Sequence, residues 1–367
     1  MKGIRYLIYL IIYASALSCS TGHSGDGNAS LMEFASYVSL NEGGAVIANP
    51  WKSGSMLQGY SFSTGETGSY RYRPGVMNDV HVPLRRIVVM TNSVARLVDE
   101  LGLASSIAGV CDAQYIRNPE VVSRLSDGRI ADCGDGMNPD IEKIMDLRPD
   151  AIFVSPFENA GYGQLEKLGV PLIECAEYME TSPLGRAEWM RFYGRLLGAG
   201  SEADSLFAVV RDSYMQLKSV ADSVSFRPSV MVDTRSGSAW YTPGGNSTIG
   251  TMISDAGGAY VFSDLENSGS VPLSFETVYD RAIDSDVWLL KSRGGQCLTY
   301  ALLESDFQGY AGFRPYREKN IWVCNVDSVP YFELTSFHPD RLLLDMVSIF
   351  HPELQAGAPS FYSPMRE

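Results

Sequence analysis

Histidine and cysteine, the residues that most often bind metal ions or act as nucleophiles, are scarce in this chain. Its 367 residues include four histidines and six cysteines. His23 and His81 lie in the irregular N-terminal part, and His338 and His351 flank the last predicted helix. No HExxH, GxSxG or CxxC motif occurs. The sequence therefore gives no support to a metalloprotease, a serine hydrolase or a zinc module, and it predicts no resident metal or cofactor.

Basic residues are scarce relative to acidic ones. Lysine and arginine together number 29, against 43 aspartates and glutamates, and the formal net charge is -14 at pH 7. Nucleic-acid binding requires concentrated positive charge, so we expect no nucleic-acid partner. Paired acids such as Asp284 and Asp286 are explained more simply as a solvated turn than as general acid and base.

The apolar run at the N-terminus is too short to cross a membrane permanently. It covers residues 6–16, follows Lys2 and Arg5, and falls short of the roughly 20 residues that a span requires. The pattern is typical of a secretory signal peptide. It ends in Ala16-Leu17-Ser18-Cys19, which resembles a bacterial lipobox, where cleavage precedes the cysteine and a lipid is attached to the thiol. This predicts a signal peptide over residues 1–18 and a periplasmic protein anchored to a membrane through Cys19. The alternative is an ordinary signal peptide that contains a cysteine.

Five cysteines remain once Cys19 is set aside. An odd number at irregular spacing is neither a disulfide scaffold nor a zinc site. One disulfide, for example between Cys111 and Cys133, is compatible with the sequence. Five buried thiols are the alternative we favour, because each cysteine ends or follows a predicted strand. The five are Cys111, Cys133, Cys175, Cys297 and Cys324.

Residues 19–84 are expected to form a tether and a β-rich extension. Residues 20–30 are small and polar, as a tether would be. From residue 34 to residue 82, short β-prone runs alternate with glycine and proline, which predicts an antiparallel set of hairpins. We assign no chemistry to this extension.

From residue 85 onward, strand and helix patterns alternate, and the length with 45% hydrophobic content favours two lobes. In the N-terminal lobe, residues 85–181, we expect strands at 86–90, 107–110, 129–131, 151–154 and 171–175, with helices at 93–103 and 141–147. In the C-terminal lobe, residues 227–367, we expect strands at 229–233, 286–290 and 320–324, with helices at 248–256, 274–282 and 339–350. Strands separated by single helices imply parallel pairing, with ligands at the carboxyl ends of the strands.

Residues 182–226 are predicted to join the lobes. One helix covers residues 182–197 and ends at Gly198-Ala199-Gly200. The next begins at Ser201-Glu202-Ala203-Asp204, which resembles a capping box, and continues to about Ser223. At 1.5 Å per residue it would be about 35 Å long, enough to back both lobes and permit only a small closing motion. The predicted fold class is α/β: two Rossmann-like lobes joined by a long backbone helix, with a small N-terminal β-rich extension.

An ordered series of segments resembles the helical-backbone class (class III) of ABC-transporter substrate-binding proteins, which includes binders of vitamin B12, ferric siderophores and haem. The segments are "RIVVMTNSVARLVDELGLASSIAGVCD", "NPDIEKIMDLRPDAIFVSP", "QLEKLGVPLIECAEY", "STIGTMISDAGG", "LSFETVYDRAIDSDVWLL" and "FHPDRLLLDMVSIFHPEL". The resemblance covers about residues 86–354. It implies a solute-binding protein that is not an enzyme.

In that family the ligand lies between the lobes, in loops after the strands, and the resemblance implies which residues contact it here. On the N-terminal lobe these are Thr91, Asn92, Ser93, Asp112, Tyr115, Met137, Asn138, Phe157, Glu158, Asn159, Tyr178, Met179 and Glu180. On the C-terminal lobe they are Arg235, Trp240, Tyr241, Gly245, Asn246, Lys291, Arg293, Tyr331 and Phe332. Aromatic rings with polar neighbours suit a large planar ligand with a polar rim. Core packing is the alternative for each aromatic residue, and helix capping is the alternative for Ser93.

The glycine-rich stretch "TPGGNSTIG" allows two interpretations. It lacks the GxxxxGK[ST] pattern, so nucleotide hydrolysis is not supported. A capped helix start is the interpretation we favour, and contact with anionic ligand groups through free N–H groups is the other.

The resemblance also implies one surface carboxylate on each lobe that pairs with arginines of the permease. On the C-terminal lobe, "LSFETVYDRA" places Glu276 at a helix start. On the N-terminal lobe, Glu158 is the first choice and Glu166 the second. A glutamate at a helix start also complements the helix dipole, which is the alternative for Glu276.

The expected function is that of a lipid-anchored binding protein of an ABC importer, which captures a metal chelate and delivers it to an inner-membrane permease. A carrier of bare metal ions would need histidine and carboxylate ligands in the loops, which the sequence does not place there. We rank a corrinoid first among the chelates, with ferric siderophore or haem as the alternative. The alternative from another functional class is an enzyme or a surface interaction protein with the same fold. A chelate that is bound and left unchanged, rather than turned over, would distinguish the binding protein from these. We expect a monomer.

Overall fold

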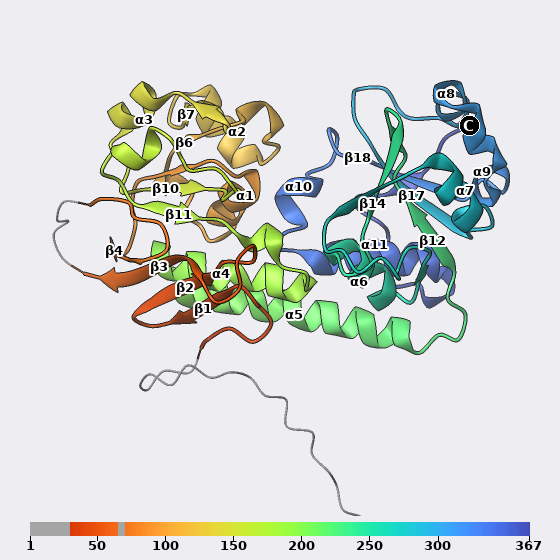
Figure 1. Ribbon diagram of the computed structural model, residues 1–367, viewed down its shortest axis with the longest axis horizontal. Coiled ribbons are helices and arrows are strands. Elements are labelled where there is room, and N and C mark those ends of the chain that lie inside the picture. Colours follow the sequence, from red (N-terminus) through yellow and green to blue (C-terminus); the bar gives the residue numbers. More distant parts are fainter. Residues whose placement is uncertain (1–29, 65–69) are drawn as a thin grey trace, which may run out of the picture.

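The computed structural model describes residues 30–64 and 70–367. The predicted signal peptide, Cys19, His23 and the tether up to residue 29 therefore lie outside the described residues. Within the described part, two α/β lobes stand side by side and the long helix α5 (Gly200–Asp222) runs along both (Figure 1). This confirms the predicted fold class.

Five parallel strands form the sheet of the N-terminal lobe, in the order β11-β10-β5-β6-β7. The inner strands are buried on both faces, which is why their sequences are continuous apolar runs rather than alternating ones. The strands are β5 (Ile87–Val89), β6 (Ile107–Val110), β7 (Ala131–Asp132), β10 (Ala151–Val154) and β11 (Leu172–Glu174), with a small pair β8 (Gly134–Asp135) and β9 (Asn138–Pro139). The helices are α1 (Asn92–Glu100), α2 (Pro119–Ser126) and α3 (Ile141–Leu147).

The C-terminal lobe repeats this plan with the order β15-β12-β17-β18-β19, in which only β19 is antiparallel to its neighbour. Its strands are β12 (Ser229–Val232), β15 (Ala259–Tyr260), β17 (Val287–Ser292), β18 (Ile321–Asn325) and β19 (Ser363–Pro364). A second, antiparallel sheet consists of β13 (Arg235–Ser236), β14 (Ala239–Pro243) and β16 (Ser270–Leu273). The helices are α6 (Thr248–Asp255), α7 (Phe275–Ala282), α8 (Tyr300–Asp306), α9 (Arg314–Arg317), α10 (Tyr331–Leu334) and α11 (Pro339–Phe350).

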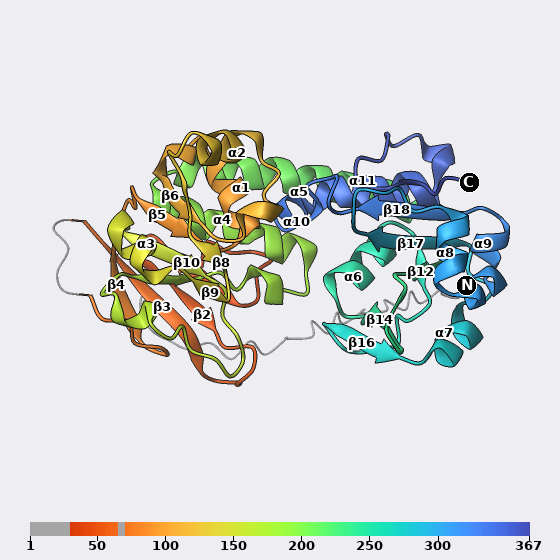
Figure 2. The same cartoon turned by 90° about the horizontal axis from the view of Figure 1, so that it is seen from above.

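Helices α4 (Pro183–Leu197) and α5 connect the lobes, and they pack against each other (Figure 2). Phe207 and Val210 of α5 belong to the N-lobe core, whereas Tyr214 and Ala221 belong to the C-lobe core. The predicted backbone helix is thus present. The capping box is wrong, because α5 starts one residue earlier, after Ala199, without a side-chain cap.

Asp204 has another role than capping. Its carboxylate forms ion pairs with Arg191 and Arg195 of α4, each at 2.8 Å. The Asp204 side chain of α5 thus contacts α4 and does not cap the first turn of α5. The pairs therefore tie α4 to α5.

The N-terminal extension is a four-stranded sheet under the N-terminal lobe, in the order β1-β2-β3-β4. Its strands are β1 (Val38–Asn41), β2 (Gly44–Ala48), β3 (Met56–Ser63) and β4 (Met77–His81). The first three strands pair antiparallel, as predicted, but β3 and β4 pair parallel. The prediction of hairpins throughout is therefore wrong at β4, because the chain crosses over between β3 and β4 instead of turning back.

Two buried carboxylates attach this extension to α4 and its approach. The Glu188 carboxylate accepts the backbone N–H groups of residues 33–35 at 2.7–2.9 Å. The Glu180 carboxylate accepts those of residues 36–37 and the Trp189 indole N–H, at 3.0 Å for the indole. Charged hydrogen bonds of this kind satisfy five consecutive backbone donors, so the segment is fixed without regular secondary structure.

A tyrosine cluster forms a second attachment. The hydroxyls of Tyr72 and Tyr162 donate to Glu174 Oε1 at 2.9 and 3.2 Å, and Tyr60 bridges the backbone of β11. Burial raises the pKa of Glu174 to about 7, against the lowering effect of these hydroxyl donors. The extension is thereby joined to the edge strand of the N-lobe sheet.

None of the helices in residues 30–64 and 70–367 is long and apolar enough to span a membrane.

Replacing Glu188 with Gln should lower the free energy of unfolding by about 2–4 kcal/mol, because the amide turns a donor toward buried N–H groups that need an acceptor. Urea unfolding measures the loss, and hydrogen exchange should show faster exchange at residues 33–35. The matched control is Glu202→Gln, an exposed glutamate in the first turn of α5. Equal stability of the two variants would contradict the role given to Glu188.

Candidate functional site

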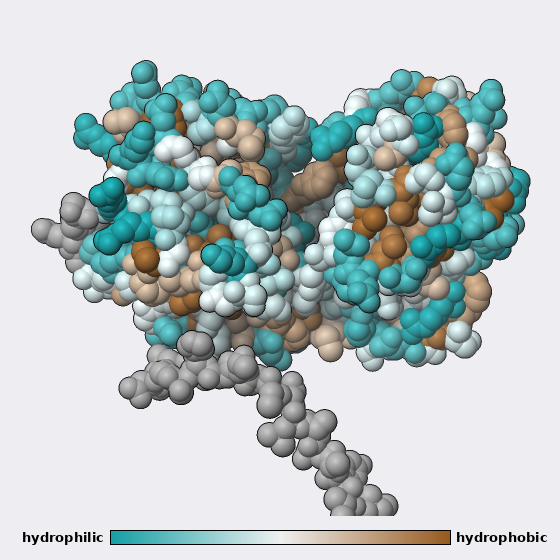
Figure 3. Space-filling model, in the orientation of Figure 1, coloured by the Kyte–Doolittle hydropathy of each residue, from teal (hydrophilic) through white to brown (hydrophobic). Residues whose placement is uncertain are grey.

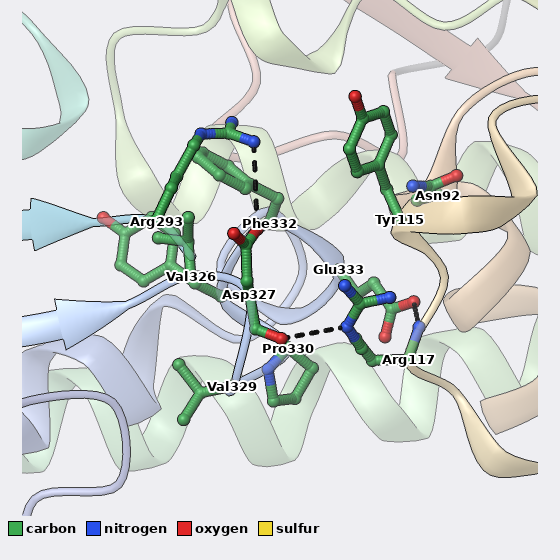
Figure 4. Close-up of a pocket in the computed structure, with 11 residues that line it drawn as sticks. Asn92, Tyr115, Arg117, Arg293, Val326, Asp327, Val329, Pro330, Phe332 and Glu333 are labelled. Atoms are coloured by element: carbon green, nitrogen blue, oxygen red, sulfur yellow. Dashed lines mark hydrogen bonds and ion pairs between the residues drawn. The ribbon is translucent and has the colours of Figure 1, made fainter. Parts of the chain in front are cut away.

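A cavity of about 280 Å³ lies between the two lobes. The space-filling view shows the surface hollowed there, and the close-up shows how the lining side chains converge from both lobes (Figures 3 and 4). The lining residues are Asn92, Tyr115, Arg117, Arg293, Val326, Asp327, Val329, Pro330, Tyr331, Phe332 and Glu333. Because they follow the carboxyl ends of parallel strands, the cavity occupies the position expected for a ligand in such a fold.

On the N-lobe side, two loops bring Asn92 and Tyr115 to the cavity. Asn92 is the first residue of α1, shortly after β5. After β6, Asp112 adopts a left-handed conformation with φ of 54°, and this turn leads into the one-turn helix η2 (Ala113–Tyr115). The Tyr115 ring is thereby left 51% exposed beside the cavity. Asp112 itself accepts the N–H of Gly136 at 3.3 Å, so it holds the neighbouring loop.

On the C-lobe side, the start of α10, after β18, supplies a pair of rings. Tyr331 is buried, Phe332 is 52% exposed, and their ring centroids lie 5.2 Å apart in an edge-to-face arrangement. The Arg293 guanidinium lies 5.8 Å from the Phe332 centroid, within reach of a cation–π contact. This side therefore presents an apolar face with a cation at its margin.

Three lining residues that the sequence did not single out hold the lobes together. Glu333 Oε1 accepts the backbone N–H of Arg117 at 2.5 Å, and Arg117 Nε donates to the carbonyl oxygen of Asp327 at 3.1 Å. Burial raises the pKa of Glu333. No motif marks these residues, since their contacts depend on how the lobes face each other. Of the three, only Asp327 could have been suspected from the sequence, because it follows the strand predicted at 320–324.

An ion pair lies next to Tyr331, at the carboxyl ends of β12 and β17. Lys291 Nζ and Asp233 Oδ1 are 2.7 Å apart. Burial lowers the pKa of Lys291, but the Asp233 carboxylate more than offsets it and leaves the pKa raised, so the lysine is cationic. No group of three or more histidine, cysteine, aspartate or glutamate residues in the described part of the chain is placed to hold a metal ion.

The family model described as "Periplasmic binding protein" matches residues 87–324. The chain belongs to this family. An uncharacterized lipoprotein of Methanocaldococcus jannaschii is 29% identical over 76% of this chain and 68% of its own. A cobalamin-binding protein of Halobacterium salinarum is 28% identical over 55% of this chain and 52% of its own. A periplasmic heme-binding protein of Pseudomonas aeruginosa has the same fold, with a TM-score of 0.61, 18% identity, and coverage of 77% of this chain and 99% of that chain.

Membership of the periplasmic binding protein family makes this chain a substrate-binding protein of a transport system and not an enzyme. The interlobe cavity unites five of the predicted ligand residues: Asn92, Tyr115, Arg293, Tyr331 and Phe332. Lys291 does not line the cavity, but its charge opposes the effect of burial, which raises the pKa of the lining residue Tyr331. Sequence reasoning thus found the aromatic part of the cavity and one of its cations.

Several other predicted residues follow N-lobe strands but do not line the cavity. Met137, Phe157 and Tyr178 are 75%, 46% and 43% exposed. The Tyr178 hydroxyl donates to the carbonyl oxygen of Pro156 at 2.6 Å, which joins two of these loops. Their contact with a ligand stays a prediction, as it does for Thr91, Asn138, Glu158, Asn159 and Met179.

Two predicted N-lobe ligand residues have internal partners instead. Glu180 is 1% exposed and binds the extension, as described above. Ser93 lies inside α1, whose N-cap is Thr91, and its hydroxyl donates to Glu177 Oε1 at 3.3 Å. The capping alternative for Ser93 is therefore wrong, and its contact with a ligand stays a prediction. For Glu180 the ligand role is wrong, because its buried carboxylate accepts two backbone N–H groups, those of residues 36–37, and the Trp189 indole N–H.

The predicted wall formed by Trp240 together with Tyr241 is also wrong. Adjacent residues of a strand point to opposite faces, and both belong to β14. Trp240 is fully buried, stacks on Trp288 at 5.8 Å and donates its indole N–H to the carbonyl oxygen of Val232. Tyr241 is 48% exposed. Arg235 lies 4.1 Å from the Phe307 ring centroid and outside the cavity.

The glycine-rich loop is a capped helix start, as favoured. Ser247 Oγ accepts the N–H of Gly250 at 3.1 Å and so begins α6. A Cβ on Gly245 would lie 2.1 Å from the Ser263 carbonyl oxygen, so close backbone packing requires glycine there. Asn246 donates to the carbonyl oxygen of Glu266. Gly245 and Asn246 therefore serve the C-lobe structure and do not line the interlobe cavity.

The cysteines beyond Cys19 are free thiols, including Cys111 and Cys133. Four are buried, as predicted, but Cys297 is exposed. It lies in the glycine-rich loop after β17, beyond the end of the buried strand. The expectation of five buried thiols is thus wrong for Cys297 only.

Replacing Trp240 with Ala should lower the free energy of unfolding by about 3–5 kcal/mol, because it opens a cavity among stacked rings in the C-lobe core. Tyr241→Ala, at the adjacent exposed position, should cost less than about 1 kcal/mol. Chemical unfolding of the two variants measures the difference. A stable Trp240→Ala protein would contradict the core assignment.

Proposed function

We propose that this protein is the lipid-anchored, solute-binding component of an ABC importer, and that it captures a corrinoid in the interlobe cleft. The observation that carries the proposal is the cavity between the lobes, where Tyr115 and Phe332 expose their rings and Asn92 and Arg293 supply polar groups. Such a combination gives a planar ligand broad apolar contact and fixes its orientation.

The cavity is small, so a large ligand would also have to contact the residues around its opening. At about 280 Å³ it lies at the low end of ligand pockets, which span roughly 300–1,000 Å³. A chelate therefore rests on the exposed rings around the opening as well as in the cavity, and the lobes part slightly to admit it.

A corrinoid ranks first because a 28% identical relative is named a cobalamin-binding protein. A ferric siderophore or haem is the second candidate, supported by a 29% identical segment of a petrobactin-binding protein of Bacillus subtilis. The lack of a metal-binding cluster in the described residues favours a metal that arrives inside a chelate. Lipid attachment at Cys19 is supported by the lipobox-like sequence and by the name of the archaeal relative.

Calorimetry with cyanocobalamin, dicyanocobinamide, haemin and a panel of ferric siderophores should show one chelate bound per chain and recovered unchanged. Tyr115→Ala combined with Phe332→Ala should weaken binding by about 1–4 kcal/mol, because both rings lose their contact area. Tyr241→Ala, which removes an exposed ring outside the cavity, is the matched control. If the wild-type protein binds none of these chelates, the chelate proposal fails.

The proposed permease contacts are Glu158 on the N-terminal lobe and Glu276 on the C-terminal lobe. Both side chains are exposed. Glu276 lies in the first turn of α7, where backbone hydrogen bonding and Ser274 lower its pKa, so it is ionised at neutral pH. Glu166 is less suitable than Glu158, because it is half-buried and accepts the N–H of Tyr162 at 2.7 Å.

Charge reversal at both positions, Glu158→Lys with Glu276→Lys, should reduce uptake by reconstituted permease about tenfold or more while leaving chelate affinity unchanged, because charge across a transient interface governs encounter and orientation. The double variant Glu142→Lys with Glu202→Lys, at the exposed starts of α3 and α5, controls for the change in net charge. Normal uptake by the double variant would place the docking sites elsewhere.

A further inference from the structure

The outer face of the extension sheet carries exposed apolar side chains. Alternate residues of its strands pack in the N-lobe core, and the residues between them point to the opposite face. The inward residues are Val38, Leu40, Ala45, Ile47, Tyr60 and Val80. On the opposite face, Val46 of β2 and Met77 of β4 are 39% and 51% exposed. Both lie in one cross-strand row, with Gly59 of β3 between them.

Gly59 leaves room for two methionine side chains on this outer face. A Cβ at Gly59 would collide with the sulfur atoms of Met56 and Met77, so these side chains occupy the space above the glycine. The bulge between β2 and β3 pairs Met56 with Ala48, which is also exposed. Flexible thioethers adapt readily to an irregular apolar partner.

Two further apolar side chains adjoin this row. Trp51 lies in the turn that joins β2 to β3 and is 36% exposed, and Val76 directly precedes β4 and is 41% exposed. Apolar side chains gathered in this way on a protein surface mark a contact with a partner or a membrane. We call this surface the extension patch, and it consists of Val46, Trp51, Met56, Val76 and Met77.

Positive charge borders the extension patch, although the chain as a whole has a formal net charge of -14. Lys52 follows Trp51 in the turn and is exposed. Arg71 and Arg73 are exposed as well, and they line a second cavity, of about 600 Å³, that Met77 also lines. Cations therefore lie beside the apolar side chains at two places along the patch.

The carboxylates that line this second cavity are bound to donors of their own. Asp79 accepts the hydroxyls of Ser61 and Ser63 at 3.1 and 2.9 Å. Asp150 accepts the backbone N–H groups of residues 85–86, each at 2.8 Å. A guanidinium fork matches phosphate oxygens through paired hydrogen bonds, so the two arginines of the cavity suit the head groups of an anionic lipid.

The chain from the predicted anchor enters the described residues at the edge of the same sheet. Leu31 donates its N–H to the carbonyl oxygen of Leu40 in β1 at 2.8 Å. From Cys19 to Ser30 the chain spans at most about 40 Å even when fully extended. A bilayer that holds Cys19 is therefore within reach of the extension. None of the strands β1 to β4 lines the interlobe cavity, so a bilayer on the outer face would leave that cavity open.

We propose that the extension patch rests on the surface of an anionic phospholipid bilayer and orients the anchored protein there. The proposal rests on the lipid anchoring at Cys19 in the proposed function. The apolar side chains enter the boundary between head groups and acyl chains, where tryptophan is favoured, and Lys52, Arg71 and Arg73 meet the phosphates. Such a contact is weak alone, so the patch orients a molecule that a lipid already holds.

The first test follows Trp51 fluorescence on vesicles of phosphatidylcholine and phosphatidylglycerol, with and without bromine on the acyl chains. The tryptophans of the lobe cores are fully buried, namely Trp189, Trp240 and Trp288. The full chain is reconstituted into the vesicles from detergent. A second form begins at Ser20 and carries a hexahistidine tag that binds a nickel-chelating lipid, so its result does not depend on lipidation of Cys19.

Brominated chains should quench at least about a third of the Trp51 signal in both forms, because an indole at the membrane interface lies beside the acyl chains. Trp51→Phe gives the background from the other tryptophans. Absence of quenching in the tagged form would overturn the proposal. If the mass of the N-terminal peptide shows no lipid on Cys19, the anchor of the proposed function fails, and the tagged form alone decides on the extension patch.

The second test measures partitioning of the tagged form onto the same vesicles without nickel lipid. Val46→Thr with Met77→Gln should lower the partition coefficient about tenfold, because two apolar side chains no longer enter the interface. The matched control is Val209→Thr with Met215→Gln, which changes an exposed valine and an exposed methionine of α5. Control variants should partition like the wild type.

Arg71→Gln with Arg73→Gln should also lower partitioning about tenfold, but only on vesicles that contain phosphatidylglycerol, because anionic head groups attract the two charges. On phosphatidylcholine alone the loss should be less than twofold. Arg129→Gln with Arg227→Gln removes two exposed arginines outside the extension and controls for net charge.

Equal partitioning of the patch variants and their controls would overturn the proposal and leave the extension patch to a protein partner. Thermal unfolding checks that each variant folds. If a patch variant does not fold, the quenching of Trp51 in the wild type decides. Chelate binding does not enter either test, so failure of the chelate proposal would leave both results unchanged.

Discussion

Helix α4 is buried on nearly every side, and the positions of the lobes and the extension follow from that burial. Twelve of its 15 residues are buried. Trp189 and Phe192 pack in the N-lobe core, Leu184 reaches the C-lobe core, and Glu188 binds the extension. A close-packed helix cannot move without opening all three contacts at once, so α4 is the reference against which the other parts are placed.

The same constraint shapes the cleft. Helix α5 contributes to both lobe cores, so the lobes can rock about it but cannot separate widely. Across the cleft, Glu333 accepts from the Arg117 backbone, and His338 Nε2 lies 2.8 Å from Glu100 Oε2. In the proposed function, a ligand that enters the cleft would exchange some of these polar contacts for contacts of its own.

Sequence patterns predicted most of the sheets and long helices, because continuous apolar runs and helical spacing reflect burial directly. The strands at β5, β10 and β17 and the helices α4 and α11 agree with the expected ranges to within one or two residues. Tyr115 and Phe332 were predicted because they follow strands, and in the family that the sequence resembles the ligand lies in the loops after the strands. Trp240 was misplaced because alternation along β14 depends on which face the small sheet presents.

Contacts between distant segments were beyond sequence reasoning. The role of Glu180 depends on residues 36–37 lying beside it, about 144 positions earlier in the chain. The hydrogen bond from the Arg117 backbone N–H to Glu333 depends on how the two lobes are oriented toward each other. The parallel pairing of β3 with β4 required a crossover that residues 56–81 do not signal by turn motifs. In each case the pairing is set by the fold as a whole rather than by local spacing.

The attachment of residues 33–37 to Glu188 and Glu180 would have a mechanical consequence if the protein is anchored at Cys19, as proposed. Any pull along the tether is borne by charged hydrogen bonds to the N-terminal lobe and α4, before it reaches the extension sheet. Phe34 of the same segment also packs against the C-lobe core, so a molecule anchored as proposed would be pulled where its two lobes meet rather than through either lobe alone.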